Sequence, residues 1–366
     1  MKVLTVLGAR PQFIKASVVS VAIAKQADME EVLVHTGQHF DANMSDIFFR
    51  ELGMEKPRHD LAINSGGHGE MTGRMLIEVE KVLQTERPDV VLVYGDTNST
   101  LAGALAAAKL HIPVAHVEAG LRSFNMRMPE EINRILTDRV SSWLFAPTKE
   151  SVGHLLREGI NPALVHQVGD VMYDVALHHG RRAMELGGGV LDRLGLTEKG
   201  FVLTTIHRAE NTDAPERLRA IVGALAQVAR ELPVVWPLHP RARREMDRQG
   251  LLAELSASVQ LIEPQGYLDM VRLEQAAAVI ATDSGGVQKE AFFHRVPCVT
   301  LRDETEWVEL VDSGWNRLIS PSDAGLIAHA ICEAPGHLGD PSVRPYGEGD
   351  AADRIVARLK VGMPSA

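Results

Sequence analysis

The chain has 366 residues, of which 45% are hydrophobic and 23% are charged, and its formal net charge is -10. This composition is ordinary for a globular enzyme, and the length predicts two domains of roughly 150 residues each. The negative charge argues against a nucleic-acid-binding protein, because phosphate backbones require a basic surface. It does not exclude a nucleotide ligand, which needs only a few local donors.

Two cysteines, Cys298 and Cys332, lie far apart in the sequence and indicate neither a disulfide framework nor a thiolate metal site. The first apolar run, residues 3–7, is too short for the core of a signal peptide. No stretch approaches the roughly 20 apolar residues of a membrane span. We therefore expect a cytoplasmic protein that binds no metal, membrane or nucleic acid.

Short runs of Val, Ile and Leu alternate with amphipathic segments along the whole chain. Runs without polar alternation are typical of parallel strands buried on both faces. Strands are expected at residues 3–7, 31–35, 90–94, 113–118, 143–146 and 165–168, and again at 201–205, 234–238, 259–262, 279–282 and 298–301. Helices between them include residues 14–26, 69–84, 101–110, 130–140, 217–231 and 286–294. This rhythm predicts doubly wound α/β domains.

The glycine-rich and charged stretch around residues 186–200 is the expected domain boundary, because the strand rhythm restarts after it. We expect one Rossmann-like domain over residues 1–186, a second over residues 187–350, and a last helix within residues 351–366 that packs back on the N-terminal domain. Two such domains would face a cleft at the carboxyl ends of their strands, where open α/β sheets bind ligands.

The first expected strand ends in Gly8-Ala9-Arg10-Pro11-Gln12, followed by Lys15. A glycine permits a tight turn, and the N-terminus of the next helix favours anions. Arg10 and Lys15 add positive charge there. The dinucleotide fingerprint Gly-x-Gly-x-x-Gly is absent from this turn. A plain turn with solvated side chains is the alternative interpretation.

Three carboxylates are expected near one edge of the first sheet. Asp96 and Glu118 each end an apolar strand, and Glu131 lies in the first turn of a helix that begins at Pro129. A carboxylate cluster in a cleft separates pKa values, as acid–base catalysis requires. Alternatively, Asp96 or Thr97 caps the next helix, and a glutamate at a helix start serves only the helix dipole.

The second half carries basic residues after its strands. His207 and Arg208 follow one strand and His239 follows another, so all three are expected at the ligand-binding edge. A structural histidine is the alternative for His207.

The turn Ser284-Gly285-Gly286 opens a helix directly after a strand. Its free N–H groups and the helix dipole suit a diphosphate. Glu290 lies one turn further along, in a position to accept hydrogen bonds from ribose hydroxyls. Arg302 follows the next strand.

Together these motifs resemble the non-hydrolysing UDP-N-acetylglucosamine 2-epimerase family over nearly the whole chain. The matching motifs are Gly8-Ala9-Arg10-Pro11 with Lys15, Thr36-Gly37-Gln38-His39, Gly95-Asp96-Thr97, His116-Val117-Glu118-Ala119-Gly120-Leu121-Arg122, Pro129-Glu130-Glu131-x-Asn133-Arg134, His207-Arg208-x-Glu210-Asn211 and Asp283-Ser284-Gly285-Gly286-x-Gln288. The resemblance implies a GT-B-like fold of two Rossmann-like domains, a homodimer and no cofactor.

The resemblance also implies a mechanism in which a base removes the C2 proton while UDP leaves C1, giving a 2-acetamidoglycal. UDP then adds back to C1, and a proton is delivered to the opposite face of C2. Asp96 would be one base, and either Glu118 or Glu131 would serve the other face. Arg10, His207 and the Ser284-Gly285-Gly286 turn would stabilise the departing diphosphate. The remaining substrate-binding residues would be Lys15, Arg134, Arg208, His239, Glu290 and Arg302.

Three departures from the main family indicate a different sugar. Trp307-Val308 follows Thr305-Glu306 in place of Arg-Pro, the segment 123–128 lacks the usual Thr/Tyr/Trp pattern, and Phe40 follows His39 where an arginine is common. The pattern is similar to a subgroup that epimerises UDP-2,3-diacetamido-2,3-dideoxy-glucuronic acid for O-antigen synthesis. Arg127 would then pair with the uronate carboxylate, unless it is a solvated loop residue.

Four alternatives remain open. The substrate can instead be UDP-N-acetylglucosamine, with UDP-N-acetylmannosamine as the product. A GT-B glycosyltransferase shares the scaffold but does not need the three carboxylates. A catalytically silent UDP-sugar sensor would lack one or more of them, and a hydrolysing epimerase would begin differently from Gly-Ala-Arg-Pro-Gln.

Overall fold

The computed structural model describes residues 1–38, 49, 51–185 and 189–362. The chain forms two compact α/β units, which we call unit 1 (Met1–Val175 and Arg344–Ala366) and unit 2 (Ala176–Val343). It leaves unit 1 within one helix, α7 (Val171–Glu185), and returns to it after Val343. The expected boundary at residues 186 and 187 lies outside the described residues, as do His39 and Phe40.

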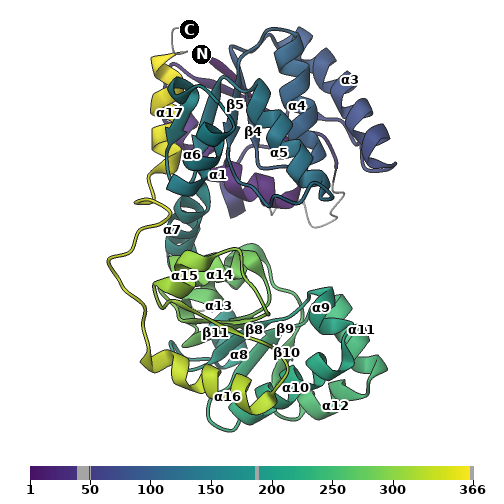
Figure 1. Ribbon diagram of the computed structural model, residues 1–366, viewed down its shortest axis with the longest axis vertical. Helices are drawn as coiled ribbons and strands as arrows, with labels where there is room; N and C mark the ends of the chain where they lie inside the picture. Colours follow the sequence, from purple (N-terminus) through teal and green to yellow (C-terminus); the bar gives the residue numbers. More distant parts are fainter. Residues whose placement is uncertain (39–48, 50, 186–188, 363–366) are drawn as a thin grey trace. The chain divides into compact units, whose positions relative to one another are not determined.

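Unit 1 is built on a seven-stranded sheet in the order β3-β2-β1-β4-β5-β6-β7 (Figure 1). Its strands are β1 (Lys2–Leu7), β2 (Glu30–His35), β3 (His59–Asp60), β4 (Val90–Tyr94), β5 (Val114–Val117), β6 (Trp143–Ala146) and β7 (Val165–Gln167). Its helices are α1 (Arg10–Ala24), α3 (His68–Glu86), α4 (Asn98–Lys109), α5 (Pro129–Val140), α6 (Lys149–Arg157), the start of α7, and α17 (Ala351–Val361), with a short 3-10 turn at Pro162–Leu164.

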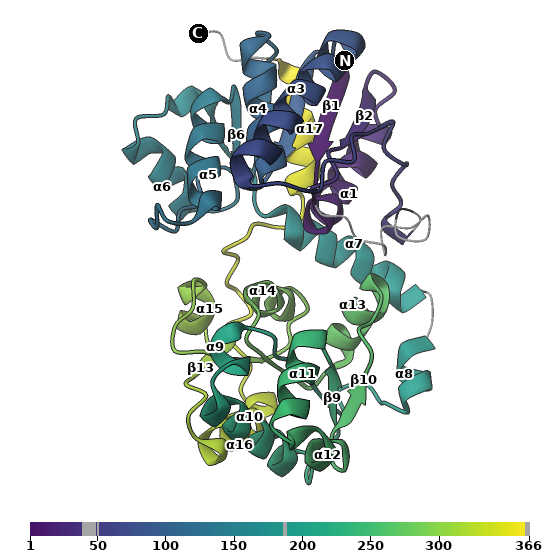
Figure 2. The same cartoon turned by 90° about the vertical axis from the view of Figure 1, so that its right-hand side faces the viewer.

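Helices cover both faces of this sheet. The last helix, α17, packs against α1 at the start of the chain, and Figures 1 and 2 show the two side by side. Valines and leucines of β1, β2 and β4 form a common buried core with α3 and α4. Burial of apolar surface on both faces is what favours parallel pairing of these strands.

Unit 2 is built on a six-stranded sheet in the order β10-β9-β8-β11-β12-β13 (Figure 2). Its strands are β8 (Val202–Thr205), β9 (Val234–Pro237), β10 (Gln260–Ile262), β11 (Val279–Thr282), β12 (Cys298–Leu301) and β13 (Asn316–Ile319). Its helices are the rest of α7, α8 (Gly189–Leu194), α9 (Ala209–Thr212), α10 (Pro215–Val228), α11 (Pro240–Arg248), α12 (Leu251–Ser256), α13 (Tyr267–Ala276), α14 (Gly285–Phe293), α15 (Val308–Asp312) and α16 (Ala324–Glu333), with a 3-10 turn at Ala334–Gly336.

Every pairing between the described strands is parallel, which confirms the prediction of doubly wound α/β domains. Two edge strands were not predicted. The strand β3 is only two residues long, and β13 begins with Asn316, a polar residue that interrupts the apolar pattern. Asn316 is nevertheless buried, because its side chain is hydrogen-bonded to Thr300 (2.8 Å) and Gln288 (3.0 Å).

Two helices begin earlier than the sequence predicts, for local reasons. Helix α1 starts at Arg10 because Pro11 fits the first turn of a helix, where its missing N–H costs nothing. Helix α4 starts at Asn98 because the Thr97 hydroxyl accepts a hydrogen bond from the Thr100 N–H and caps the helix. Along the described part of the chain, no helix is both long and apolar enough to cross a membrane.

A buried ionic network fixes the strand ends of unit 1. The His116 ring on β5 donates from Nδ1 to Asp138 of α5 (2.7 Å) and from Nε2 to the Gly95 carbonyl (2.8 Å). Asp138 also accepts from Arg122 (2.7 Å) and from the Gly120 N–H (3.2 Å). One buried carboxylate thus joins His116, Arg122 and Gly120 and holds the turns that follow β4 and β5.

We expect Asp138→Asn to destabilise unit 1 by about 3 kcal/mol, because it leaves the buried Arg122 charge without its buried carboxylate and weakens the hydrogen bond to His116. Urea unfolding read by hydrogen exchange and mass spectrometry reports the peptides of unit 1 separately. Glu158→Gln is the matched control, because Glu158 binds the same Arg122 but has a side chain 27% exposed. Its cost should be about 1 kcal/mol or less. Equal costs for the two variants would contradict this account.

Candidate active site

The turn after β1 is organised by one buried amide. Gln12 of α1 accepts hydrogen bonds from the N–H groups of Gly8 (2.8 Å) and Ala9 (3.1 Å), and it donates to the Tyr94 carbonyl at the end of β4 (2.7 Å). Gly8 is required here, because a Cβ would lie 1.9 Å from the Ser99 hydroxyl. The N–H donors of Gly8 and Ala9 are therefore already used within the protein, and Arg10 follows them as the first residue of α1.

Asp96 stands directly after β4 and is not a helix cap. Thr97 caps α4, which leaves the Asp96 carboxylate available for other contacts. Its Oδ2 accepts from Arg134 of α5 at 2.9 and 2.7 Å. No described residue donates to its other oxygen, and the side chain is 29% exposed. Asp96 is therefore a partly accessible side chain held in place by the Arg134 guanidinium.

Glu118 follows β5 in a left-handed backbone conformation, with φ of 71°. This conformation costs a residue with a side chain roughly 1–2 kcal/mol, and such strain is concentrated at functional positions. The carboxylate is only 8% exposed and forms an ion pair with Lys15. Burial by itself lowers the pKa of Lys15, but attraction and hydrogen bonding to Glu118 raise it above its ordinary value, so the amine stays charged.

Glu131 is a carboxylate whose hydrogen bonds are already made. It accepts from the Ser123 N–H and hydroxyl, from the Phe124 N–H (each 2.9 Å) and from Arg134 (2.7 Å). Burial alone would raise the pKa of Glu131, but the bonds from Ser123, Arg134 and Phe124 lower it. These contacts suit a group that anchors the loop 121–128 better than one that takes up protons.

The neighbouring Glu130 differs from Glu131 in this respect. It is partly exposed, and no described residue donates a hydrogen bond to it.

Arg127, the expected uronate contact, is exposed on the loop that Glu131 anchors, and its backbone N–H bonds the Asn125 side chain (3.1 Å).

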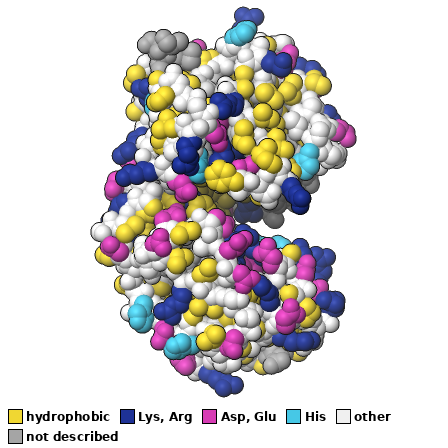
Figure 3. Space-filling model, viewed as in Figure 1, with side chains coloured by type: hydrophobic (Ala, Val, Ile, Leu, Met, Phe, Trp, Pro, Cys, Tyr) yellow, Lys and Arg dark blue, Asp and Glu magenta, His cyan; other side chains and the backbone are white. Residues whose placement is uncertain are grey.

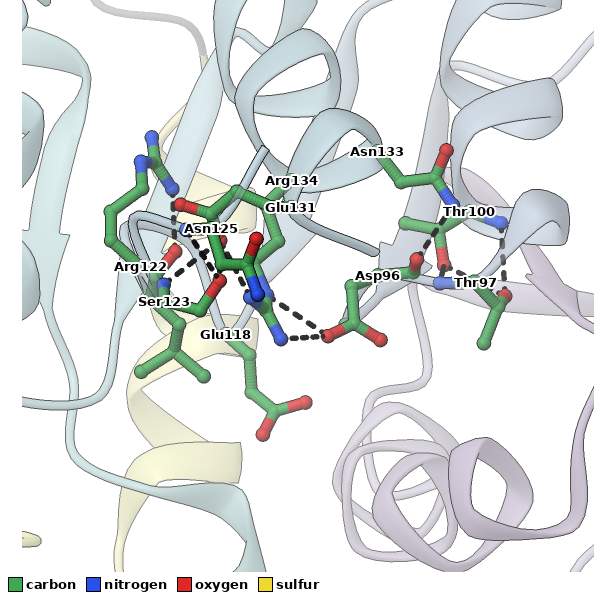
Figure 4. Close-up of polar contacts among 12 residues, drawn as sticks. Asp96, Thr97, Thr100, Glu118, Arg122, Ser123, Asn125, Glu131, Asn133 and Arg134 are labelled. Carbon is green, nitrogen blue, oxygen red and sulfur yellow. Dashed lines mark hydrogen bonds and ion pairs between the residues drawn. The ribbon is translucent and has the colours of Figure 1, made fainter. Parts of the chain in front are cut away.

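Figure 4 shows Arg134 reaching toward Asp96, with the Glu118 carboxylate nearby. Burial lowers the pKa of Arg134, but Asp96 and Glu131 raise it above its ordinary value, so its charge is secure. This edge of unit 1 thus presents two carboxylates, Asp96 and Glu118, each beside a permanent cation. Such a set can exchange protons with a bound substrate while the cations stabilise negative charge.

In unit 2, a buried carboxylate organises the turn after β8. Asp283 follows β11 and accepts hydrogen bonds from the N–H groups of His207 (3.1 Å) and Arg208 (3.0 Å) and from the Asn211 amide (3.1 Å). Its side chain is fully buried, and its Oδ1 lies 3.4 Å from Nδ1 of His207. Asp283 therefore fixes both His207 and Arg208 at the carboxyl edge of this sheet.

His207 and His239 lie together at that edge. Their ring centroids are 5.8 Å apart, although they follow different strands. His239 caps α11 by accepting from the Arg241 N–H (3.2 Å). Partial burial and the neighbouring His207, Arg241 and Arg244 lower the pKa of His239, which favours its neutral form.

The turn before α14 presents free donors. The first helical hydrogen bond runs from Gln288 to the Ser284 carbonyl (3.3 Å), so the N–H groups of Gly285 and Gly286 precede it. A Cβ at Gly286 would meet nothing closer than 3.9 Å. This open helix N-terminus suits a phosphate.

Two further residues expected at this edge are Arg302, which follows β12, and Glu290, which belongs to α14. Arg302, after β12, contacts Glu306 at 2.7 Å. Glu290 lies on α14, where burial raises the pKa of its carboxyl, and burial together with Glu290 raises that of Glu274.

The sequence analysis missed the groups that hold these side chains in place. Gln12, Asp138 and Asp283 do not figure among the expected site residues, yet each accepts hydrogen bonds from the backbone of a turn at the site. The sequence could have identified Asp283 as a site residue, because it follows an apolar strand just as Asp96 does. Among the described residues, no group of three or more His, Cys, Asp and Glu side chains could hold a metal ion.

Comparison with known proteins identifies the family. The family model for UDP-N-acetylglucosamine 2-epimerase matches residues 21–360. A UDP-2,3-diacetamido-2,3-dideoxy-D-glucuronate 2-epimerase from Pseudomonas aeruginosa is 55% identical over 363 residues, which cover 98% of this chain and 99% of that protein.

Two solved structures are similar to this chain in their fold as well as in sequence. The UDP-GlcNAc 2-epimerase of Methanocaldococcus jannaschii has a TM-score of 0.89 at 43% identity, over 99% of this chain and 100% of that one. The enzyme from Neisseria meningitidis, bound to UDP-GlcNAc, has a TM-score of 0.84 at 31% identity, over the same shares. The GT-B-like architecture predicted from the sequence is therefore confirmed, and the chain belongs to the UDP-N-acetylglucosamine 2-epimerase family.

Proposed function

We propose that this protein inverts C2 of a UDP-linked N-acetylated amino sugar without hydrolysing it. The observation that carries the proposal is the pair of carboxylates on unit 1, Asp96 and Glu118, each held beside a cation. A glycosyltransferase on this scaffold has no need for such a pair. Family membership supports the same reaction.

The proposed reaction needs no cofactor. One carboxylate takes the C2 proton while the C1–O bond breaks, and UDP leaves with the bonding electrons to give a 2-acetamidoglycal. UDP then adds back to C1, and C2 receives a proton on its opposite face. On unit 2, the free N–H groups of Gly285 and Gly286, with His207 and Arg208, would stabilise the diphosphate as it leaves.

We further propose that the sugar is UDP-2,3-diacetamido-2,3-dideoxy-glucuronate, with a role in O-antigen synthesis. The Pseudomonas relative is named for that substrate, and it is more similar than the relatives named for UDP-N-acetylglucosamine given above. Arg127 supports the proposal, because it is an exposed guanidinium on the loop anchored by Glu131, and guanidinium groups bind carboxylates in a two-pronged geometry.

Proton NMR in D2O tests the reaction and the sugar together. We expect deuterium to enter C2, with formation of the manno isomer, when the UDP-diacetamido-glucuronate is supplied. Arg127→Gln should raise KM for the uronate about tenfold, since a charged hydrogen bond is lost, and should leave any slower reaction of UDP-N-acetylglucosamine unchanged. Turnover of UDP-N-acetylglucosamine alone would assign the main-family reaction, and no exchange on either sugar would refute the epimerase proposal.

The acid–base assignment is tested by matched amide variants. Asp96→Asn and Glu118→Gln should lower C2 exchange by a factor of at least about 100 while UDP still binds. Comparing Glu130→Gln with Glu131→Gln shows which of these two neighbouring carboxylates affects C2 exchange. Since Glu131 anchors a loop, we expect its variant to loosen hydrogen-exchange protection of residues 121–128. A folded, well-protected Glu131→Gln protein with no C2 exchange would instead make Glu131 an acid–base group, as the sequence suggests.

We also propose a cytoplasmic homodimer. Both cysteines are free, as expected in a reducing compartment. Figure 3 shows hydrophobic side chains gathered over α4 and α5 of unit 1, where Ile132 and Leu136 are 41% and 43% exposed, and Ile77 of α3 is 54% exposed. Contiguous exposed apolar surface is typical of a subunit contact.

Light scattering after gel filtration tests the proposed dimer. We expect the mass of two chains for the wild type and of one chain for Ile132→Asp/Leu136→Asp, because each charge would be buried without a partner. Leu326→Asp is the control, since Leu326 is exposed on α16 of unit 2. A monomeric wild type would disprove the dimer.

A further inference from the structure

The segment that follows β12 is fastened to α14 by its side chains. The Thr305 hydroxyl donates to the Gln288 side chain (2.6 Å), and the Trp307 indole N–H donates to the Gly285 carbonyl (2.9 Å). The Lys289 ammonium lies 4.5 Å from the centre of the Trp307 ring. These contacts on both sides of Glu306 fix its backbone beside the N-terminus of α14.

The Glu306 carboxylate lies where three anion-binding groups meet. Its Oε2 is 2.7 Å from Arg302, and its Oε1 is 3.7 Å from Arg208. The same Oε1 would be 2.4 Å from a Cβ at Gly285, so it stands directly against the first residue of α14. Two guanidinium groups and a helix N-terminus are the donors that bind a diphosphate, and here they face a carboxylate of the protein itself.

The carboxylate is free to leave this position. The Glu306 side chain is 44% exposed, whereas that of Arg302 is only 10% exposed. An exposed ion pair contributes little to stability, so moving Glu306 into water costs little. Arg302 is the more constrained partner, and the backbone of Arg208 is fixed by Asp283, so both guanidinium groups stay near this position for an incoming anion.

We infer that Glu306 is a built-in competitor for the diphosphate of the substrate: its carboxylate occupies the position formed by Arg208, Arg302 and the start of α14, and a bound diphosphate displaces it. This inference rests on the proposed binding of UDP by unit 2. Glu306 balances the two arginine charges when the position is empty. It also weakens UDP binding, which aids release of the finished UDP-sugar.

Calorimetric titration of UDP into the full-length wild type, Glu306→Gln and Asp303→Asn tests the inference. Asp303 is a matched control, because it lies in the same segment but is paired with Arg217 and accepts from Ser320 (2.7 Å). We expect Glu306→Gln to bind UDP about threefold to tenfold more tightly than the wild type, as the loss of one or two competing ion pairs implies. Asp303→Asn should match the wild type, and the affinity of Glu306→Gln for uridine, which has no phosphate, should be unchanged.

Unchanged or weaker UDP binding by Glu306→Gln would overturn the inference, because Glu306 would then be neutral or would position the arginines. The same gain in UDP affinity in Asp303→Asn would also overturn it, because the effect would then come from net charge. A gain in the affinity of Glu306→Gln for uridine would overturn it too, because the effect would then come from nucleoside contacts. If the wild type binds UDP and only the ratio between variants fails, the proposed function stands. Failure of the wild type to bind UDP would refute the proposed function itself.

Discussion

The Asp138 carboxylate is the constraint on which the edge of unit 1 that carries Asp96 and Glu118 depends. It lies between the buried side chains of His116 and Arg122, and it also receives the Gly120 N–H. Through His116 it reaches the Gly95 carbonyl, one residue before Asp96. Because a buried charge must be paired, these groups have little freedom to move independently. The positions of Asp96 and Glu118 are therefore consequences of an ion network that lies beneath them.

In unit 2, a single side chain fixes the turn that carries the expected site residues. Asp283 receives two consecutive backbone N–H groups and an amide, and it thereby shapes the turn that carries His207 and Arg208. In both units a buried aspartate thus holds the backbone turns at the carboxyl ends of parallel strands, and the side chains that those turns carry are positioned from inside the unit.

The sequence predicted the fold well because apolar strands buried on both faces carry a strong signal. It failed at β3 and β13, where the strand is short or is anchored by the polar Asn316. At the site, the sequence identified residues at strand ends but could not show which of the carboxylates are held by hydrogen bonds from other residues. Glu130 and Glu131 are adjacent and chemically alike, and only the four hydrogen bonds to Glu131 distinguish them. Such contacts depend on a loop whose path local sequence does not determine.

The Gln12 side chain restricts which ligands the turn after β1 can bind through its backbone. In dinucleotide-binding relatives of the fold, the main-chain donors after the first strand hold a pyrophosphate. Here an amide of the protein already takes the Gly8 and Ala9 donors and ties them to the neighbouring strand. These two donors are therefore not available to a pyrophosphate, and an anion that approaches this turn must be held by other groups.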